Sequence, residues 1–540
     1  MAWVRPRGGT DQLRTVRSGL HEPEHDNSRP DRYTDAVNVW NFLGTAAQRW
    51  PTRPAMRQGG RQFDHAEAAR LARQLAASLH ARGVRPGDRV GVLMHNELDH
   101  YLTYFGVAAA GAILVSLNTR LSVGEQVGIL RHSGSGVLLH DAAHAGRAAE
   151  LTATWPGLCT DVAQAIADGR PGAAAVTDHL ADADQPAQLY YTSGTTGNAK
   201  GVVLTHRNVC THALAAVQEL GLSANDTWAH IAPMFHLADA WATFAVTAVG
   251  GTHVFLPHFT PRDALDLLAN ERVTITNLVP TMLNTMVKEP DAGARTYSLR
   301  TMLSGGAPIA PDVVRRILAT FRCDYVQTYG MTETSPYLTL SLLSPELQRL
   351  PPEQQLAWKC KTGRPFHGVW LKVVDDAGEP IAADGKAIGE IRVRGATVTP
   401  GYWQNPEATA AAFDRDGFLC TGDLATIDAH GYVDIVDRKK DVIKTGGEAV
   451  YSIEVEHVLY AHAAVLECAV FGLPDAHWGE RVVAAVVLRP GHAATTAELI
   501  AFCKDRIAHY KAPKEVRFLD ALPRTGSGKI TKKVLRDTMR

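Results

Sequence analysis

The sequence has few cysteines and no excess of charge of either sign. Its seven cysteines are widely spaced and form no Cys-x-x-Cys pair, which argues against a disulfide framework and against a structural zinc site. The 55 Lys and Arg residues nearly balance the 56 Asp and Glu residues, so the formal net charge is −1. No global field exists to attract polyanions, and we expect no nucleic-acid partner.

The sequence also lacks a long apolar run. A membrane-spanning helix needs about 18 or more apolar residues, and the nearest candidate, residues 105–117, is shorter and carries two glycines. We expect that stretch to be a buried core segment and the chain to have no transmembrane segment. The first 30 residues are polar, without the apolar stretch of a secretory signal. The expected location is therefore the cytoplasm, with reduced thiols.

Residues 1–34 lack periodicity and are rich in Arg, Asp, Pro and Gly, which predicts a disordered or loosely attached arm. Within this arm, His21 to His25 spell the zinc-protease pattern H-E-x-x-H. That pattern requires both histidines on one face of a regular helix. Pro23 stands between them and no apolar face surrounds them, so we reject the match.

The chain that follows the arm alternates helical and strand patterns. Leucines recur every four residues within 68–82, which predicts a helix, and residues 89–94 form an apolar run that predicts a buried strand. Similar runs occur at 254–256, 274–279 and 324–327. This alternation predicts an α/β fold with mostly parallel sheets, and 540 residues allow three to five structural units.

The pattern changes after residue 366. Short β-prone runs at 369–375, 389–395 and 431–436 are separated by Gly, Asp and Pro turns, which predicts a small antiparallel unit. Beyond residue 438 we predict a helix at 452–460, strands at 466–471 and 482–488, a helix at 497–509 and a loop-like tail at 522–533. A domain boundary is expected in the charged segment 437–440, and no internal repeats are found.

Two glycine-rich loops contain a lysine. Residues 191–201 read YTSGTTGNAKG directly after a strand-like segment. Glycines let backbone N–H groups approach an anion, hydroxyls add donors and Lys200 adds charge, which indicates contact with phosphate. The second loop, residues 523–529, reads PRTGSGK and by itself fits a solvated tail. Neither loop has the spacing of a Walker A motif.

Taken together with these loops, the order of further motifs resembles the adenylate-forming superfamily, specifically its acyl-CoA synthetase (fatty-acid–CoA ligase, luciferase-like) branch. The resemblance runs from about residue 37 to the C-terminus. Its motifs are TSGTTGNAKG (192–201), PMFH (233–236), SGGAP (304–308), YGMTE (329–333), GEI (389–391), TGD (421–423), DRKKD (437–441) and the Lys529 loop.

The resemblance implies a fold and a domain plan. It predicts an α/β protein with a large N-terminal domain of layered, mostly parallel sheets and helices, containing a small β-barrel-like subdomain, and a small, mobile α+β C-terminal domain. In this chain the ATP- and acid-binding domain would span 35–437, with 366–437 as its β-rich part. The mobile domain would span 438–540 and carry the catalytic lysine.

The implied reaction is ATP-dependent ligation of a carboxylic acid to CoA through an acyl-adenylate, with release of pyrophosphate. Two anions meet in the first step, so positive charge and metal must neutralise the transition state. Lys529 would bridge the carboxylate and the α-phosphate, and Glu333 would hold Mg²⁺. Thr332 would lie beside the α-phosphate, and His236 would form a wall of the acyl site. The remaining residues implied in ATP binding are Thr192, Ser193, Gly194, Thr195, Thr196, Gly197, Lys200, Gly305, Gly306, Ala307, Tyr329, Gly330, Met331, Asp423 and Arg438.

Within this set, Tyr329 would offer a flat face to adenine, and Asp423 would accept hydrogen bonds from the ribose hydroxyls with Arg438 in support. The second step would follow a rotation of the C-terminal domain about Lys440, which removes Lys529 and brings in the CoA thiol. The residues implied on the CoA side are Lys444, Gly446, Gly447 and Trp478.

The acid is less well specified than the nucleotide. The resemblance points to a fatty or related carboxylic acid, with an acyl pocket formed by His236, Trp241, Ser304 and Gly306. Trp241, Phe244 and Tyr337 could shorten the tunnel for a small or aryl acid, or could pack into the core and leave a long channel. The expected partners are thus a carboxylic acid, ATP and CoA; a homodimer is left open.

The sequence departs from the family pattern at two places. Asn198-Ala199 replace the usual x-Pro before Lys200, which removes a fixed φ angle but no charge. Ala449 follows Gly446-Gly447-Glu448 where asparagine is usual, which weakens the case for CoA. An alternative is therefore an adenylating enzyme with a non-CoA acceptor (an amine or a carrier thiol), or one that activates an oxyanion such as nitrite. A catalytically silent homologue is disfavoured because Lys529, Glu333, Thr332 and Asp423 are all present.

Overall fold

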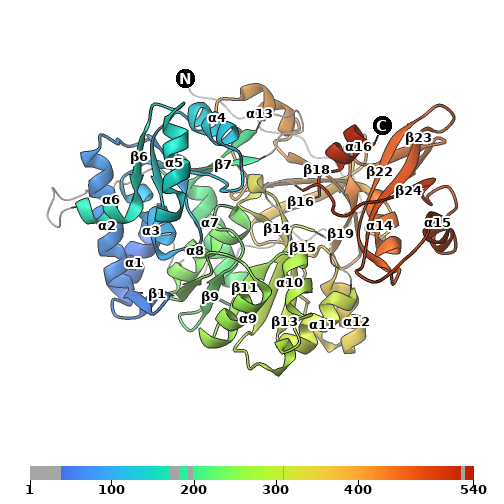
Figure 1. Ribbon diagram of the computed structural model, residues 1–540, viewed down its shortest axis with the longest axis horizontal. Coiled ribbons are helices and arrows are strands. Elements are labelled where there is room, and N and C mark those ends of the chain that lie inside the picture. The colour runs from blue at the N-terminus through green and yellow to red at the C-terminus, as the bar shows by residue number, and fades with distance from the viewer. Residues whose placement is uncertain are drawn as a thin grey trace, which may run out of the picture. The chain divides into compact units, whose positions relative to one another are not determined.

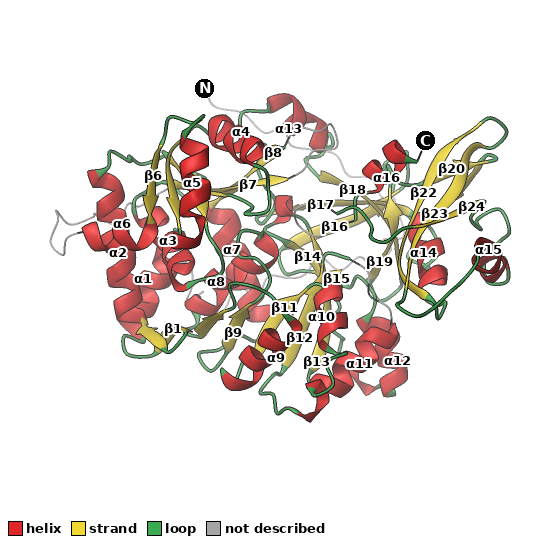
Figure 2. Ribbon diagram, in the orientation of Figure 1, coloured by secondary structure: helices red, strands yellow, loops and turns green. Residues whose placement is uncertain are grey.

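The computed structural model describes residues 38–169, 182–192, 199–307, 309, 311–524 and 530–539. The arm, with its H-E-x-x-H match, lies outside these residues. Two mostly parallel sheets form the larger part of residues 36–540 (Figures 1 and 2). This confirms the α/β prediction.

The first sheet has six strands in the order β6-β5-β3-β4-β7-β8. All neighbours are parallel except β8, which runs antiparallel to β7 at one edge. The strands are β3 (Arg89–Leu93), β4 (Ile113–Ser116), β5 (Ser135–His140), β6 (Leu158–Asp161), β7 (Pro186–Thr192) and β8 (Lys200–Thr205).

The second sheet has nine strands in the order β15-β14-β13-β12-β11-β9-β10-β1-β2. Its strands from β13 to β1 run parallel, and β2, β14 and β15 add antiparallel edges. The strands are β1 (Pro54–Gln58), β2 (Arg61–Asp64), β9 (Thr227–His230), β10 (Thr252–Phe255), β11 (Ile275–Leu278), β12 (Thr301–Gly305), β13 (Asp324–Gly330), β14 (Tyr337–Leu340) and β15 (Arg364–Pro365).

Helices pack against these sheets, and α7 and α8 occupy the middle of the view between the two sheets (Figure 2). The largest apolar cluster joins α2, α3, α7 and α8 to strands of both sheets. The α-helices of this region are α1 (Trp40–Arg49), α2 (His65–Ala81), α3 (Leu98–Ala109), α4 (Val123–Ser133), α5 (Ala145–Thr152), α6 (Val162–Asp168), α7 (His206–Glu219), α8 (Leu237–Ala248), α9 (Pro261–Asn270), α10 (Pro280–Met286), α11 (Pro311–Phe321) and α12 (Pro352–Lys359). Short 3₁₀ turns are η1 (Ala142–His144), η2 (Ala292–Ala294), η3 (Thr332–Thr334) and η4 (Leu347–Arg349).

The β-rich unit is a four-stranded antiparallel sheet in the order β16-β17-β18-β19, with β16 and β19 as its edges rather than a closed barrel. Its strands are β16 (Val369–Val374), β17 (Gly389–Gly395), β18 (Leu419–Ile427) and β19 (Val433–Arg438), and α13 (Pro406–Ala412) precedes β18. The predicted strands at 369–375, 389–395 and 431–436 are thus all present.

The described residues beyond β19 form a five-stranded sheet with three helices. The elements are β20 (Ile443–Thr445), β21 (Glu448–Val450), α14 (Ser452–Tyr460), β22 (Val465–Asp475), β23 (Gly479–Leu488), α15 (Thr496–Lys504), β24 (Glu515–Phe518) and α16 (Lys532–Thr538). The helix predicted at 497–509 is therefore too long at its C-terminal end, and the tail predicted as a loop contains the start of α16.

Other boundaries also differ from the sequence prediction. Helix α2 starts earlier than predicted because Asp64 caps it, its side chain accepting a 2.8 Å hydrogen bond from the backbone N–H of Glu67. Residues 105–117 are buried as expected, divided between α3 and β4. None of the described helices combines the length and apolar character needed to cross a membrane. All seven cysteines are unpaired.

Candidate active site

The predicted ribose residues Tyr329, Asp423 and Arg438 meet where β13 ends beside β18 and β19. The hydroxyl of Tyr329 donates a 2.7 Å hydrogen bond to Oδ2 of Asp423. Arg438 lies opposite Asp423 in the β18–β19 ladder, and its Nε is 3.2 Å from Oδ1. Burial and the Asp423 carboxylate raise the pKa of Tyr329 well above its usual value, so the hydroxyl stays protonated and donates. A carboxylate has about four lone-pair sites, so Asp423 retains acceptor capacity for further hydroxyls.

Strands β7 and β8, an antiparallel hairpin, flank the predicted phosphate loop. Thr192 and Lys200 are opposite each other in this antiparallel pair. The predicted contacts Ser193, Gly194, Thr195, Thr196 and Gly197 lie outside the described residues. The ammonium of Lys200 lies 4.9 Å from the ring centroid of Tyr402, which is within the range of a cation–π contact.

Tyr402 links this hairpin to the predicted metal ligand. Its hydroxyl donates a 2.9 Å hydrogen bond to Oε1 of Glu333, which is 6% exposed. Burial and the Glu333 carboxylate raise the pKa of Tyr402, so the hydroxyl donates at any physiological pH. Sequence reasoning did not identify Tyr402, which lies in an aperiodic loop 69 positions from its partner.

The loop 397–403 joins the hairpin to the Glu333 turn through its backbone. The N–H of Thr399 donates to the carbonyl of Glu333 at 2.8 Å, and the hydroxyl of Thr399 donates to the carbonyl of Val203 at 2.5 Å. The N–H of Trp403 donates to the carbonyl of Gly201 at 2.7 Å. Lys200 and Glu333, which come from different sheets, are therefore held by one shared loop.

Glycines permit the close approaches in the predicted adenine region. A Cβ on Gly305 would lie 2.2 Å from Oγ1 of Thr328, and one on Gly330 would lie 1.8 Å from the carbonyl oxygen of Pro336. Gly306 has φ +86°, a conformation that favours glycine. The adjacent Ala307 is exposed, and its carbonyl accepts a hydrogen bond from Gln327. Met331 and Thr332 are half-buried beside Glu333.

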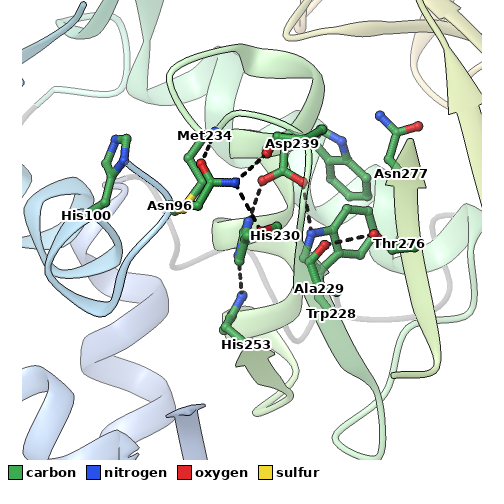
Figure 3. Close-up of polar contacts among 12 residues, drawn as sticks. Asn96, His100, Trp228, Ala229, His230, Met234, Asp239, His253, Thr276 and Asn277 are labelled. Atoms are coloured by element: carbon green, nitrogen blue, oxygen red, sulfur yellow. Dashed lines mark hydrogen bonds and ion pairs between the residues drawn. The ribbon is translucent and has the colours of Figure 1, made fainter. Parts of the chain in front are cut away.

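The loop that carries His236 is held by buried side chains of the β3–α3–β4 segment. Asn96 donates to the carbonyls of His230 and Ala232 and accepts from the N–H of Met234, at distances of 2.8–3.0 Å. Figure 3 shows these contacts around Asn96. The hydroxyls of Tyr104 and Ser116 donate to the carbonyls of Met234 and Phe235. His236 then occupies the N-cap position of α8.

A buried polar chain fixes the start of α8. Nδ1 of His230 is 2.5 Å from Oδ2 of Asp239, and Nε2 of His230 is 3.0 Å from Nδ1 of His253 (Figure 3). Burial raises the pKa of Asp239 and lowers that of His253. All three side chains are fully buried, so these polar contacts are part of the core that positions the loop carrying His236.

The aromatic residues near the predicted acyl pocket pack against one another. The Trp241 ring is 1% exposed and contacts the rings of Trp228, His212 and Tyr337 at centroid distances of 5.0–5.6 Å. Phe244 packs edge-on against Tyr104. Of the two arrangements left open from the sequence, these rings adopt core packing. Ser304 is fully buried at the end of β12.

The predicted CoA-side residues lie together. The N–H of Gly446 donates to the carbonyl of Trp478 at 2.8 Å, and the N–H of Lys444 donates to the carboxylate of Glu480 at 2.7 Å. Gly446 and Gly447 have φ +59° and +85°. A Cβ on Gly446 would lie 3.0 Å from the Trp478 ring. Trp478 is 44% exposed, so its indole is available to a ligand.

The predicted hinge lies at the end of β19. The side chain of Lys440 is exposed there. Just before it, Asp437 accepts hydrogen bonds from the backbone N–H and the hydroxyl of Ser452, the first residue of α14. Lys529, the predicted catalytic lysine, lies outside the described residues.

Comparison with known proteins identifies the family of this chain. The family model described as AMP-binding enzyme matches residues 43–403, and that described as AMP-binding enzyme C-terminal domain matches residues 454–529. A feruloyl-CoA synthase from Amycolatopsis sp is 39% identical over 90% of this chain and 96% of its own length. A long-chain-fatty-acid–CoA ligase from Thermus thermophilus is 36% identical over 96% of this chain and 98% of its own.

Solved structures agree with these sequence relatives. The o-succinylbenzoate-CoA synthetase MenE from Bacillus subtilis, in complex with its acyl-adenylate intermediate, aligns with a TM-score of 0.81 and 32% identity over 93% of this chain and 98% of that one. The same enzyme in complex with ATP and magnesium aligns with a TM-score of 0.80 and 31% identity over 92% and 98%. The chain belongs to the AMP-binding enzyme family and is an AMP-forming acid–CoA ligase.

Proposed function

We propose that this ligase activates a fatty or related carboxylic acid at the segment 329–333, where two polar clusters meet. The observation that carries the proposal is that Tyr329 contacts the Asp423–Arg438 pair while Glu333, in the same segment, contacts Tyr402 beside Lys200. The first cluster suits a ribose and the second suits a chain of phosphates. One ATP molecule lying along this segment would contact both.

On the nucleotide side, Asp423 accepts hydrogen bonds from the ribose hydroxyls. Tyr329 and Arg438 each contact one oxygen of the Asp423 carboxylate and orient it. The ring of Tyr329 and the backbone of Gly305, Gly306 and Ala307 flank adenine, next to Gly330 and Met331. Thr192, Lys200 and the loop residues 193–197 hold the β- and γ-phosphates. Thr332 lies beside the α-phosphate.

The Glu333 side fits the Mg²⁺ that accompanies ATP in this family. The donor is a buried carboxylate with a neutral hydroxyl, that of Tyr402, on one oxygen, and Mg²⁺ binds through one or two carboxylates together with phosphate oxygens and water. When bound, the ion would neutralise charge on the phosphates. Tyr402 orients the carboxylate, and its own ring is faced by the Lys200 ammonium.

In the first step a carboxylate oxygen of the acid attacks the α-phosphorus, and the bond to the β-phosphate breaks to release pyrophosphate. Lys529 stabilises the negative charge that develops there. His236 and Gly306 flank the acid side, and the buried Trp241 and Ser304 pack in the core beside it. In the second step the CoA sulfur attacks the acyl carbonyl carbon, and AMP leaves with the electrons of the bond that breaks. Lys444, Gly446, Gly447 and Trp478 guide the thiol.

In this proposal, residues 35–437 bind ATP and the acid. Residues 438–540 form a domain that rotates about Lys440 between the two steps. We further propose a cytoplasmic location, which the seven unpaired cysteines support. Relatives that act on feruloyl and on long-chain fatty acyl groups have nearly equal identity to this chain. Their names therefore support a carboxylic acid with a sizeable apolar tail.

The test is ATP–pyrophosphate exchange with fatty, aryl and amino acids and with nitrite, followed by thioester assays with CoA. We expect exchange with one class of carboxylic acid and its conversion to thioester. Lys529→Ala should abolish exchange yet leave thioester formation from supplied adenylate, whereas the exposed Lys533→Ala control should behave as wild type. Equal loss of both steps in Lys529→Ala would contradict the assignment. Exchange without thioester would shift the proposal to an amine or carrier thiol.

A further inference from the structure

Away from the nucleotide site, imidazole and carboxylate groups converge beyond the carboxyl ends of neighbouring strands. His95 follows β3, and Asp141 and His144 follow β5, which is parallel to β3 and adjacent to it. One ligand atom from each of these three side chains lies within 4.8 Å of the others. Asp141 and His144 are buried, and His95 is half-buried.

Asp141 is the hub of this cluster. Its Oδ1 accepts from the N–H of His144 at 2.9 Å and lies 2.6 Å from Nδ1 of the same residue. Its Oδ2 accepts from the N–H of His95 at 2.8 Å and lies 3.3 Å from Nδ1 of that residue. Capping of the turn at residues 142–144 accounts for the backbone contacts. It does not account for two imidazole rings directed at one carboxylate.

Two further observations point to a ligand. Nδ1 of His95 is buried and, although it lies 3.3 Å from Oδ2 of Asp141, it forms no well-aligned hydrogen bond; an ion bound between the two groups would satisfy this buried polar atom. A third imidazole, that of His258 in the segment after β10, packs edge-on against His95 with the ring centroids 4.4 Å apart. The rings of His95 and His144 are 4.3 Å apart. Ligand atoms of His95, Asp141 and His144 thus converge, and the ring of His258, from a third segment, lies against that of His95.

We propose that His95, Asp141 and His144 form a binding site for one divalent transition-metal ion of the zinc type, with His258, whose ring packs against that of His95, as its fourth ligand. Imidazole with carboxylate is a donor set that suits zinc, cobalt or nickel and not magnesium. Tetrahedral zinc at about 2.1 Å from each ligand separates the ligand atoms by about 3.4 Å, so small side-chain rotations close the site. The ion would fasten the segment after β3 to the segments after β5 and β10.

The position of the site gives the ion a structural task. His95 immediately precedes Asn96, whose side chain holds the backbone of residues 230–234. None of the four proposed ligands belongs to the residues assigned above to ATP, acid or CoA. The proposal therefore stands independently of the reaction. Loss of the ion should change the metal content and the melting temperature of the protein, and these two quantities are the readouts of the test.

The test uses the full-length chain without an affinity tag, stripped with a chelator and titrated with Co²⁺ and then with Zn²⁺. We expect one equivalent of Co²⁺ to give the visible absorption of a four-coordinate site, Zn²⁺ to displace it, and the melting temperature to rise. His144→Gln and His95→Gln should each weaken Co²⁺ binding by at least about 10-fold. Circular dichroism of the metal-free variants checks that they fold.

Two matched variants make the result decisive. His492→Gln, an exposed histidine of the C-terminal region, should bind Co²⁺ like the wild type. The double variant His21→Gln/His25→Gln, in the arm, should do the same. Equal binding by the wild type and His144→Gln, or loss of binding only in the arm variant, would overturn the proposal. Absence of any Co²⁺ or Zn²⁺ binding would also overturn it and leave a hydrogen-bonded turn.

Discussion

Tyr329 and Asp423 are 94 positions apart in the chain, and their side chains meet in a 2.7 Å hydrogen bond at the proposed ribose site. Arg438 contacts the other oxygen of the same carboxylate. The aspartate is therefore oriented before a nucleotide arrives. Such preorganisation lowers the conformational cost of binding.

Tyr329→Phe keeps the ring that would face adenine and removes this hydrogen bond. Bonds to charged groups contribute about 1.5–3 kcal/mol, so we expect the KM for ATP to rise by roughly 10-fold or more in pyrophosphate exchange. The KM for CoA, measured with supplied adenylate, serves as the internal control and should stay unchanged. A parallel rise in both constants would argue against a ribose role.

Tyr402→Phe tests the positioning of Glu333. The variant removes the 2.9 Å hydrogen bond to the carboxylate but retains the ring beneath Lys200. We expect the rate of adenylate formation to fall by roughly 10- to 100-fold, because a hydrogen bond to a charged group contributes about 1.5–3 kcal/mol. The Mg²⁺ concentration needed for half-maximal activity should rise. Tyr297→Phe, which removes a hydroxyl bonded to the carbonyl of Ala292, is the matched control. An unchanged Mg²⁺ dependence would reduce Tyr402 to a packing residue.

Trp478→Ala tests the CoA side. Trp478 is 44% exposed, so its loss should change the free energy of unfolding by no more than about 0.5 kcal/mol. If its indole contacts CoA, the KM for CoA should rise by roughly 10-fold, equivalent to about 1.4 kcal/mol, while pyrophosphate exchange is unaffected. Trp370→Ala, at a 59% exposed position on β16, provides the comparison. Similar kinetics for the two variants would remove Trp478 from the CoA path.

Lowering the pH should destabilise the protein because it protonates buried histidines on unfolding. His100 gives the clearest case. Burial lowers its pKa to about 4, so between pH 6.5 and 4 the unfolded chain binds a proton that the folded protein does not. Stability therefore falls as the pH is lowered through this window. The contribution of this one group at pH 5 is about 2 kcal/mol relative to pH 7.

His100→Asn retains a donor near the position of Nδ1 but has no titrating ring. Its melting temperature should fall less steeply between pH 7 and pH 5 than that of the wild type, whatever its stability at pH 7. His492→Gln, which replaces an exposed histidine, should leave the pH slope as it is. Identical slopes for wild type and His100→Asn would mean that His100 is protonated in the folded protein.

The sequence predicted elements far better than contacts. Strands such as β3 and β17 follow from apolar runs bounded by turns, because that pattern is local. The link from Tyr402 to Glu333 spans 69 positions and depends on how the loop 397–403 crosses between two sheets, which no periodicity reports. The start of α16 was missed because residues 530–533 carry no apolar repeat long enough to distinguish a short helix from a loop.

The proposed metal site was inaccessible to sequence reasoning for a related reason. Cysteine pairs and the H-E-x-x-H match, the sequence patterns that indicate zinc, are both short-range. His95, Asp141 and His258 are distributed over three loops, and only the parallel arrangement of the strands brings two of these loops together. The candidate nucleotide residues were found because family motifs mark them, not because their spacing implies contact.

The hydrogen bonds that hold the backbone of residues 230–236 determine how this enzyme could be re-engineered. Asn96, Tyr104 and Ser116 hold the backbone of that loop from a different sheet, so the loop that leads into His236 takes its shape from side chains more than a hundred positions earlier. A chimera that exchanged only the loop would lose these anchors. The unit to transplant between ligases of different acid preference is the loop together with the β3–α3–β4 segment that holds it.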